Sequence, residues 1–228
     1  MKKFIFYCFT LLFCTPFIAS AEGDLQSPEI FQKLNQKINL DLSFLDQNGN
    51  QKSLREMFKQ THVLILTLNY YRCTTMCTFQ FLNLAQTLND LGSSVGNDFQ
   101  IASVSFDPTD TVQKAQETQK LWGQKSGPQG ARWNFYVGKN SNIIPLTKSL
   151  NFYYEKDKEG NYSHAAALFF IKPDGTFYRY LYGVVYDKTD FTNALIETSG
   201  GRVGSVFQKM RALFYKFDSV RGKYQLWI

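Results

Sequence analysis

The stretch VLILTLNYYRCTTMCTFQFLNLAQTLNDLG, residues 63–92, joins a continuous apolar run to a helical pattern through two cysteines. The run at 63–70 is typical of a strand buried on both faces. After Cys77 the apolar residues recur at helical spacing, and Gly92 is a natural helix stop. The pair Cys73 and Cys77 is therefore expected where a buried strand gives way to a helix.

The rest of the chain alternates in the same way. It predicts a strand or hairpin at 38–51, a short helix at 54–60 behind the capping box Ser53–Glu56, and a helix at 111–122 capped by Asp110. The Asp174-Gly175 pair centres a strong hairpin signal. Strands alternating with helices and ending in an antiparallel hairpin predict an α/β fold, a mixed sheet flanked by helices with an N-terminal hairpin extension. The other expected elements are strands at 99–106 and 132–138 and helices near 144–150 and 189–200.

The first 21 residues form a different kind of segment. Lys2 and Lys3 precede an apolar run that ends in Ala19-Ser20-Ala21, the pattern of an export signal cut before Glu22. An uncleaved membrane anchor is the alternative, although the run is short for a full span and contains Pro16. The expected organisation is a signal peptide at 1–21, a linker at 22–35, one domain at 36–200 and a basic, aromatic segment at 201–228.

Removal of the signal changes the cysteine count and the charge. It takes away Cys8 and Cys14, so two of the four cysteines remain. It also removes two of the 25 basic residues and none of the 19 acidic ones, which leaves +4 in place of +6. This mild surplus does not call for a nucleic-acid partner, and export argues against one. It favours contact with an anionic membrane surface.

The two remaining cysteines are a poor structural disulfide and a good pair of metal ligands. Residues i and i+4 of a regular helix are roughly 6 Å apart along the axis, so a disulfide there is expected to be strained and easily reduced. On one helix face at the helix N-terminus, the two sulfurs are favoured as thiolates, which suit Cu(I). His164, at the mouth of a later strand, is a candidate third ligand that would also admit Cu(II). His62 is expected to be structural.

Three segments in this order resemble the Sco/SenC family, the thioredoxin-like copper chaperones of cytochrome c oxidase assembly. They are VLILTLNYYRCTTMC, ASVSFDPTDT and SHAAALFFIKPDGTFYRYLYG, and the resemblance covers about residues 36–200. It implies a thioredoxin-like fold and copper ligation by Cys73, Cys77 and His164. The chain departs from the family at Thr74 and Thr78, where members commonly have proline after a cysteine.

The resemblance also implies partners and a location. The partner is a copper-accepting subunit of a respiratory oxidase, with an upstream copper donor or a thiol reductant, and the location is periplasmic or membrane-associated on the oxidising side. A thiol–disulfide reductase acting on the cysteines of the acceptor is the alternative, since it needs the same two thiols. Redox sensing is a third hypothesis that no residue singles out. The segment at 206–228 is expected to be a helix docked on the core, with a membrane-surface tail as the alternative.

Overall fold

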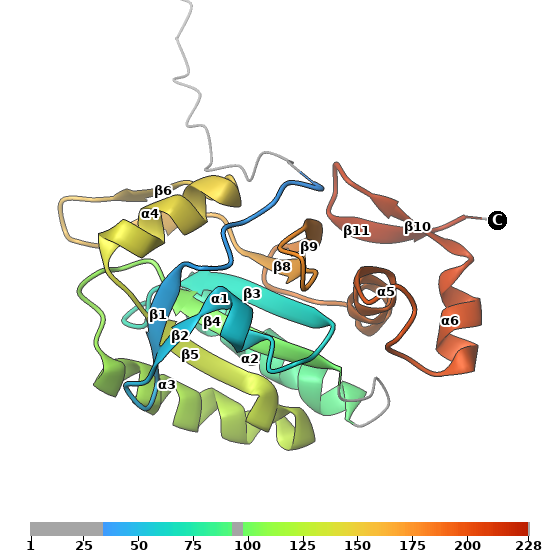
Figure 1. Cartoon of the computed structure of the whole chain (residues 1–228), viewed down its shortest axis with the longest axis horizontal. Coiled ribbons are helices and arrows are strands. Elements are labelled where there is room, and N and C mark those ends of the chain that lie inside the picture. Colours follow the sequence, from blue (N-terminus) through green and yellow to red (C-terminus); the bar gives the residue numbers. More distant parts are fainter. Residues whose placement is uncertain (1–33, 93–97, 228) are drawn as a thin grey trace, which may run out of the picture.

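The computed structural model describes residues 34–92 and 98–227, so the expected signal peptide and most of the expected linker lie outside the described residues. Seven strands of the described chain form one mixed sheet in the order β2-β1-β5-β4-β3-β8-β9 (Figure 1). This confirms the mixed α/β class. The strands are β1 Ser43–Asp46, β2 Gln51–Ser53, β3 Val63–Asn69, β4 Phe99–Ser105, β5 Trp133–Val137, β8 Ala167–Ile171 and β9 Phe177–Tyr182.

Strands β3, β4 and β5 are parallel and form the centre of the sheet. Every residue of these three strands is buried, as expected for strands covered on both faces. Strands β8 and β9 complete the sheet as an antiparallel hairpin beside β3, which confirms the predicted hairpin around Asp174-Gly175. Gly175 has φ +83°, and a side chain there would come within 2.9 Å of the Ile38 carbonyl oxygen.

Helices cover both faces of this sheet. Helices α2 (Met76–Leu91) and α3 (Val112–Lys125) lie along one face, and α4 (Asn140–Ser149) lies on the other (Figure 1). Helix α5 (Lys188–Thr198) contacts β8, β9 and α2. The predicted apolar stripe of α2 is buried, so its periodicity marks the face that packs on the sheet. A short helix α1 (Leu54–Met57) and the 3₁₀ segment Gly127–Arg132 complete this part of the chain.

Of the two helix caps predicted from the sequence, one is confirmed and the other is not. Ser53 and Glu56 form the predicted capping box at α1. The prediction that Asp110 caps α3 is wrong, because the Thr111 hydroxyl accepts the Lys114 N–H at 3.2 Å in that role. The Asp110 carboxylate instead accepts hydrogen bonds from the Tyr71 backbone N–H and the Ser105 hydroxyl, and is therefore directed away from the helix end.

The C-terminal segment is only partly helical. Helix α6 (Val206–Ala212) has no buried residue, and it is followed by a hairpin of β10 (Tyr215–Asp218) and β11 (Lys223–Leu226). Aromatic residues of one hairpin face, Phe217 and Tyr224, pack toward Tyr180 of β9. The expected docked helix is thus wrong for the last part of the chain, where alternating side chains form a strand pair. Among the described residues, no helix has the length and apolar character needed to cross a bilayer.

Candidate metal centre

The two cysteines lie on either side of the start of α2. The helix begins at Met76, so Cys73 lies in the preceding turn and Cys77 in the first helical turn. The Cys77 backbone N–H donates to the Cys73 sulfur at 3.4 Å, while Thr75, at the N-cap position, makes no side-chain cap. The expectation that both cysteines share a regular helix face is therefore wrong. Within the described chain neither cysteine is in a disulfide, and the strain expected for an i,i+4 disulfide within a helix does not apply to them.

The environment places one proton on this pair at neutral pH. A hydrogen bond from the Cys77 thiol, with further donors from the Cys77 backbone, lowers the pKa of Cys73 to about 4. The hydroxyl of Tyr70 adds to this effect. The same bond to the Cys73 sulfur, together with burial, raises the pKa of Cys77 well above its ordinary value. The half-buried Cys73 is thus the thiolate and the buried Cys77 the thiol.

His164 reaches the cysteines from a separate hairpin. Strand β6 (Tyr154–Lys156) pairs with β7 (Tyr162–His164), and His164 is the last residue of β7. The His164 Nδ1–H donates to the Ala165 carbonyl at 2.8 Å, which leaves Nε2 as the free nitrogen, 3.4 Å from the Cys77 sulfur. Burial lowers the pKa of His164, so the ring is neutral at pH 7 and its lone pair is available to a metal.

Aromatic rings surround the imidazole. The ring centroids of Tyr70, Phe106 and Phe152 lie 5.9, 5.0 and 5.8 Å from that of His164. Phe106 is fully buried and also packs edge-on against Tyr162 of the hairpin. These contacts restrict the ring to one orientation and exclude water from its far side.

A buried polar network fixes the helix behind Cys77. The Gln80 side chain accepts a hydrogen bond from Asn69 at 2.7 Å and donates to the Ala167 carbonyl and to the Tyr186 hydroxyl. It therefore ties the first turns of α2 to the ends of β3 and β8. The role of Gln80 was not predicted from the sequence. A polar residue three positions after Cys77, next to the apolar Phe81, could have indicated a buried side chain that needs hydrogen-bond partners.

Two acids anchor the turn that precedes Cys73. The Asp107 carboxylate bonds the Arg72 guanidinium at 2.7 Å, and Asp110 accepts the Tyr71 N–H at 2.8 Å and the Ser105 hydroxyl at 2.6 Å. Burial alone would raise the pKa of Asp107, but its bonds from Thr109 and Arg72 hold it below the ordinary value. Burial raises the pKa of Asp110. Neither carboxylate is directed at the thiols.

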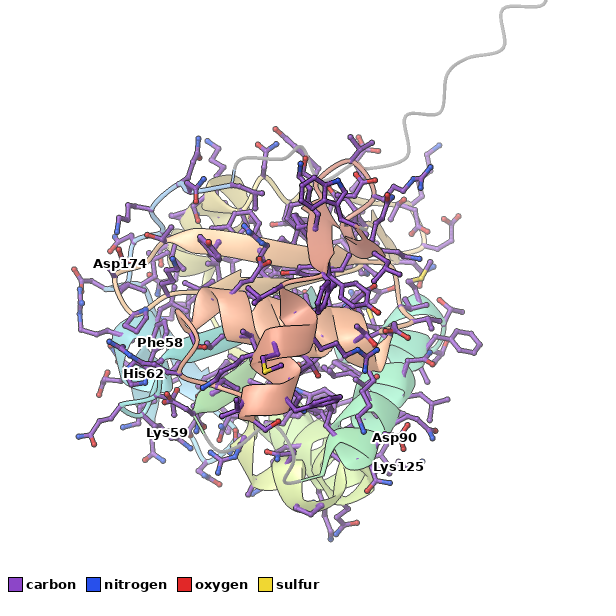
Figure 2. The ribbon with its side chains drawn as sticks, turned by 90° about the vertical axis from the view of Figure 1, so that its right-hand side faces the viewer. Phe58, Lys59, His62, Asp90, Lys125 and Asp174 are labelled. Carbon is purple, nitrogen blue, oxygen red and sulfur yellow. The ribbon has the colours of Figure 1, made fainter. Side chains whose placement is uncertain are left out.

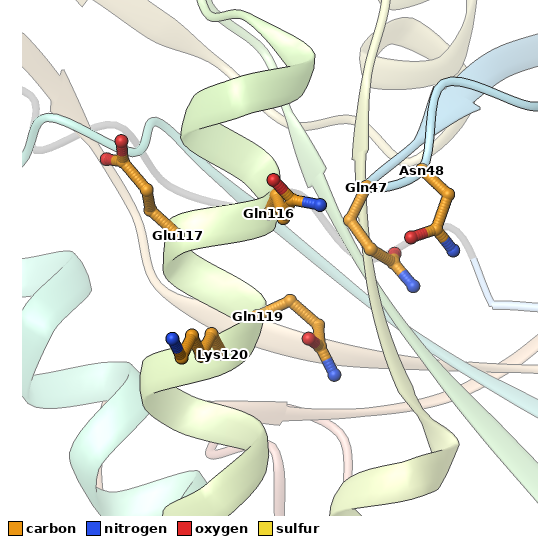
Figure 3. Close-up of a pocket in the computed structure, with 6 residues that line it drawn as sticks. All are labelled: Gln47, Asn48, Gln116, Glu117, Gln119 and Lys120. Carbon is orange, nitrogen blue, oxygen red and sulfur yellow. The ribbon is translucent and has the colours of Figure 1, made fainter.

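Other candidate positions contribute nothing to this centre. His62 directly precedes β3, at the end of the strand remote from the cysteines, and its backbone N–H donates to the Asp98 carboxylate at 2.9 Å. Figure 2 shows His62 beside Phe58 and Lys59. A groove of about 630 Å³ lies between the β1–β2 turn and α3 (Figure 3). Its lining residues are Gln47, Asn48, Gln116, Glu117, Gln119 and Lys120. None of them has a sulfur or an imidazole, so this groove offers no ligands for a soft metal.

The donor types fit a soft metal, although the three side chains are not already gathered around one point. Within residues 34–92 and 98–227, no group of three His, Cys, Asp or Glu residues forms a ready metal cage. Cys77 and His164 are in direct contact, and the Cys73 sulfur adjoins them through the Cys77 N–H. A metal held by all three therefore requires these side chains to rearrange around it. Two thiolates and one imidazole are suited to Cu(I).

The site is thus a pair of thiols between a strand and a helix of a mixed α/β sheet, with an imidazole supplied by a separate hairpin. Comparison with known proteins shows the family to which the chain belongs. The SCO1/SenC family model matches residues 32–198, so the chain belongs to the SCO1/SenC family. No curated protein sequence matches the chain.

Solved structures of Sco proteins share the fold. Arabidopsis thaliana ScoI with copper bound is 19% identical, covers 73% of this chain and 98% of its own, with a TM-score of 0.58. A SCO1/SenC family lipoprotein from Bacillus anthracis str. Ames is 19% identical over 75% and 98%, with a TM-score of 0.59. BsSco, a Sco-family cytochrome c oxidase assembly protein in which a disulfide switch was identified, is 21% identical over 75% and 98%, also at 0.59. The predicted thioredoxin-like fold is confirmed by this likeness.

Proposed function

We propose that this protein binds copper through Cys73, Cys77 and His164 and transfers it to a copper-accepting subunit of a respiratory oxidase. The observation that carries the proposal is the 3.4 Å contact between the Cys77 sulfur and the His164 Nε2, which brings together residues 87 positions apart. Membership of the SCO1/SenC family and the copper bound by Arabidopsis ScoI support it. Copper is the cargo in this proposal, so the site must release it as well as hold it.

The residues divide the work of binding. Cys73 is already ionised at neutral pH and partly exposed, so it makes the first bond to incoming copper. Cys77 loses its proton and closes the site from the buried side, and His164 supplies Nε2. Transfer proceeds by exchange of ligands: thiolates of the acceptor replace the exposed Cys73 first and the buried Cys77 last. Cu(I) is the favoured state, and the imidazole also allows Cu(II).

The proposal is tested by titrating the reduced protein with Cu(I) against a chromophoric chelator. We expect one copper retained per chain. If a folded, fully reduced protein retained no copper, the proposal would be wrong. Disulfide exchange would then be the activity to measure. Loss of copper with either cysteine replaced by serine is the accompanying expectation.

Copper affinity is expected to rise with pH between 6 and 8. The pKa of Cys77 is raised, so Cys77 carries a proton throughout this range and must release it on binding, whereas Cys73 is already a thiolate and His164 already neutral near pH 7. Release of one proton predicts that the association constant increases about tenfold per pH unit. Competition titrations across the range measure the slope, and proton release into a weak buffer counts the proton directly. A flat profile would contradict ligation by Cys77.

A thiol–disulfide exchange function is the second candidate, and the state of the two thiols favours it specifically. An accessible Cys73 thiolate beside a buried Cys77 thiol is the arrangement of an attacking and a resolving cysteine. Cys73 would attack a disulfide of the acceptor to form a mixed disulfide. Cys77, after losing its proton, would displace the acceptor dithiol, leaving this protein oxidised by two electrons. The disulfide switch identified in BsSco supports this candidate.

The variant His164→Ala is expected to separate the two candidates. It removes one proposed copper ligand and leaves both thiols, so copper affinity should fall by about a hundredfold. The rate of disulfide exchange with a model disulfide should change only modestly. His62→Ala is the matched control and should leave copper affinity unaltered. Equal copper affinity in His164→Ala and the unsubstituted protein would exclude His164 from the ligand set.

We further propose that the protein is exported and acts on the oxidising side of a membrane. The basic and apolar segment at 1–21 supports a signal, and the related Bacillus anthracis protein is described as a lipoprotein. N-terminal sequencing of the protein from membrane and soluble fractions decides between cleavage before Glu22 and a retained anchor.

A further inference from the structure

The side of the molecule formed by α6 and the β10–β11 hairpin exposes large apolar residues beside basic ones. This is the side that faces the viewer in Figure 2. Phe207 is 74%, Leu213 80% and Trp227 70% exposed. The Trp227 backbone N–H donates to the Phe214 carbonyl at 2.7 Å, so the helix end and the hairpin end adjoin. The exposed apolar residues of this face, which we term the C-terminal face, are Val206, Phe207, Met210, Leu213, Phe214 and Trp227.

The spacing of these residues shows that they share one side. Residues 206, 210 and 213 follow the helical i, i+4, i+7 pattern, and 207 and 214 flank that line. In the hairpin, Phe217 and Tyr224 are directed inward onto β9, whereas Lys216 lies over the Trp227 ring at 5.5 Å. Helix α6 has no buried residue, and the exposed Trp227 at the end of the hairpin lies beside the end of this helix. Their apolar side chains together form a surface that the described chain itself does not cover.

The charge of this segment is strongly positive. Residues 201–228 contain six basic residues and one acidic residue, a net charge of +5, whereas residues 22–228 together carry +4. The rest of the expected mature chain is therefore at −1. Among the residues that the structure describes, neither Lys209 nor Lys216 forms a salt bridge. Basic side chains around an apolar stripe are the composition of a helix that lies on an anionic membrane surface.

A polar groove beside the apolar stripe adds a place for a headgroup. It has a volume of about 110 Å³, lies between α5 and α6, and has two cationic residues and no acid among those that line it. The buried Asn193 amide nitrogen has no hydrogen-bond partner within the described chain, so a donor is available there. Arg211 is held across the groove by a 3.0 Å bond to Thr189. The lining residues are Lys188, Thr189, Thr192, Asn193, Gln208 and Arg211.

We propose that the C-terminal face, with this groove, binds the surface of an anionic lipid bilayer. The apolar side chains of α6 and Trp227 enter the interface, the lysines and arginines contact lipid phosphates, and the groove takes one phosphate headgroup. If two copies of the protein met through this face, two segments with a net charge of +5 each would repel one another, which disfavours self-association. The proposal is independent of copper binding, because no residue of the candidate metal centre takes part.

Vesicle co-sedimentation of the chain from Glu22 onward tests this surface, because that chain keeps the whole described fold. We expect binding to phosphatidylcholine vesicles that contain phosphatidylglycerol, weakened by salt, and little binding to phosphatidylcholine alone. Leu213→Ser should lower the partition coefficient about tenfold, from the loss of one buried apolar side chain. The double variant Lys216→Gln/Lys223→Gln should lower it about twenty-five-fold, at about fivefold per charge near the surface.

Matched controls come from exposed positions on other helices. Leu121→Ser on α3 removes an exposed leucine, and Lys120→Gln/Lys148→Gln removes two exposed lysines, all away from the C-terminal face; these variants should bind vesicles like the parent. All variants should show the circular dichroism spectrum of the parent. Equal binding to neutral and anionic vesicles, no binding, or no effect of Leu213→Ser would overturn the proposal. So would a dimer that Leu213→Ser converts to a monomer, or thermal stabilisation by inorganic phosphate that matches the effect of vesicles.

Discussion

Replacing Cys77 with serine is expected to weaken Cu(I) binding enough for a competing chelator to remove the metal, while leaving the protein folded. Cys77 is fully buried, contacts His164 Nε2 at 3.4 Å and donates its backbone N–H to Cys73, so it links the other two proposed ligands. Structural Zn²⁺ sites with four ligands bind with about 10–16 kcal/mol, which is about 3 kcal/mol per ligand; on the same scale, loss of one thiolate should lower copper affinity by a factor of about a hundred or more. Competition with a chromophoric Cu(I) chelator measures this loss.

The control for this variant lies in the same loop. Thr74→Ser removes a methyl group between the two cysteines without removing a sulfur, and we expect it to keep the affinity of the parent. Cys73→Ser should behave like Cys77→Ser, because it removes the other thiolate. If Cys77→Ser retained copper as tightly as Thr74→Ser, the metal would be held elsewhere and the proposed ligand set would be wrong.

Replacing Phe106 with alanine is expected to weaken both the fold and the copper site. Phe106 is fully buried directly after β4, and its ring contacts His164, Tyr154 and Tyr162, so it holds the β6–β7 hairpin against the sheet. Removal of a buried phenylalanine ring costs about 3–5 kcal/mol of unfolding free energy. Since the hairpin carries His164, copper affinity should fall as well, by about tenfold. Denaturant unfolding and copper competition measure the two effects.

Phe99→Ala separates the loss of stability from the loss of the site. Phe99 is also fully buried, but it lies at the opposite end of β4 from the cysteines, where it pairs with Val63. It should cost a similar unfolding free energy and leave copper affinity unaltered in the folded protein. An equal fall in copper affinity for both variants would mean that Phe106 acts only through global stability.

Much of the fold follows from local patterns in the sequence. The apolar run at 63–70 identified β3 because a strand covered on both faces has no polar side to show. The periodic residues of α2 and the Asp174-Gly175 turn likewise encode their own environment. The candidate site could also be predicted from the sequence, because few residue types bind soft metals and the chain from Glu22 onward has only two cysteines and two histidines.

The remaining features depend on tertiary contacts that a local pattern does not contain. Cys73 lies outside α2 because its sulfur accepts the Cys77 N–H and so takes the place of an N-cap. Asp110 is drawn from the α3 cap by Tyr71 and Ser105, which are 39 and 5 positions away in the chain. The hairpin that carries His164 and the hairpin at the C-terminus are each fixed by aromatic packing onto distant strands.

X-ray absorption spectroscopy of the protein loaded with one Cu(I) tests the central claim most directly, because it reports the atoms bound to the metal. The proposal predicts two sulfur neighbours at thiolate distance and one nitrogen neighbour with the scattering pattern of imidazole. In His164→Ala the imidazole contribution should disappear and the sulfur contribution remain. A first shell with sulfur only in the unsubstituted protein, or one with no sulfur, would contradict the proposed site.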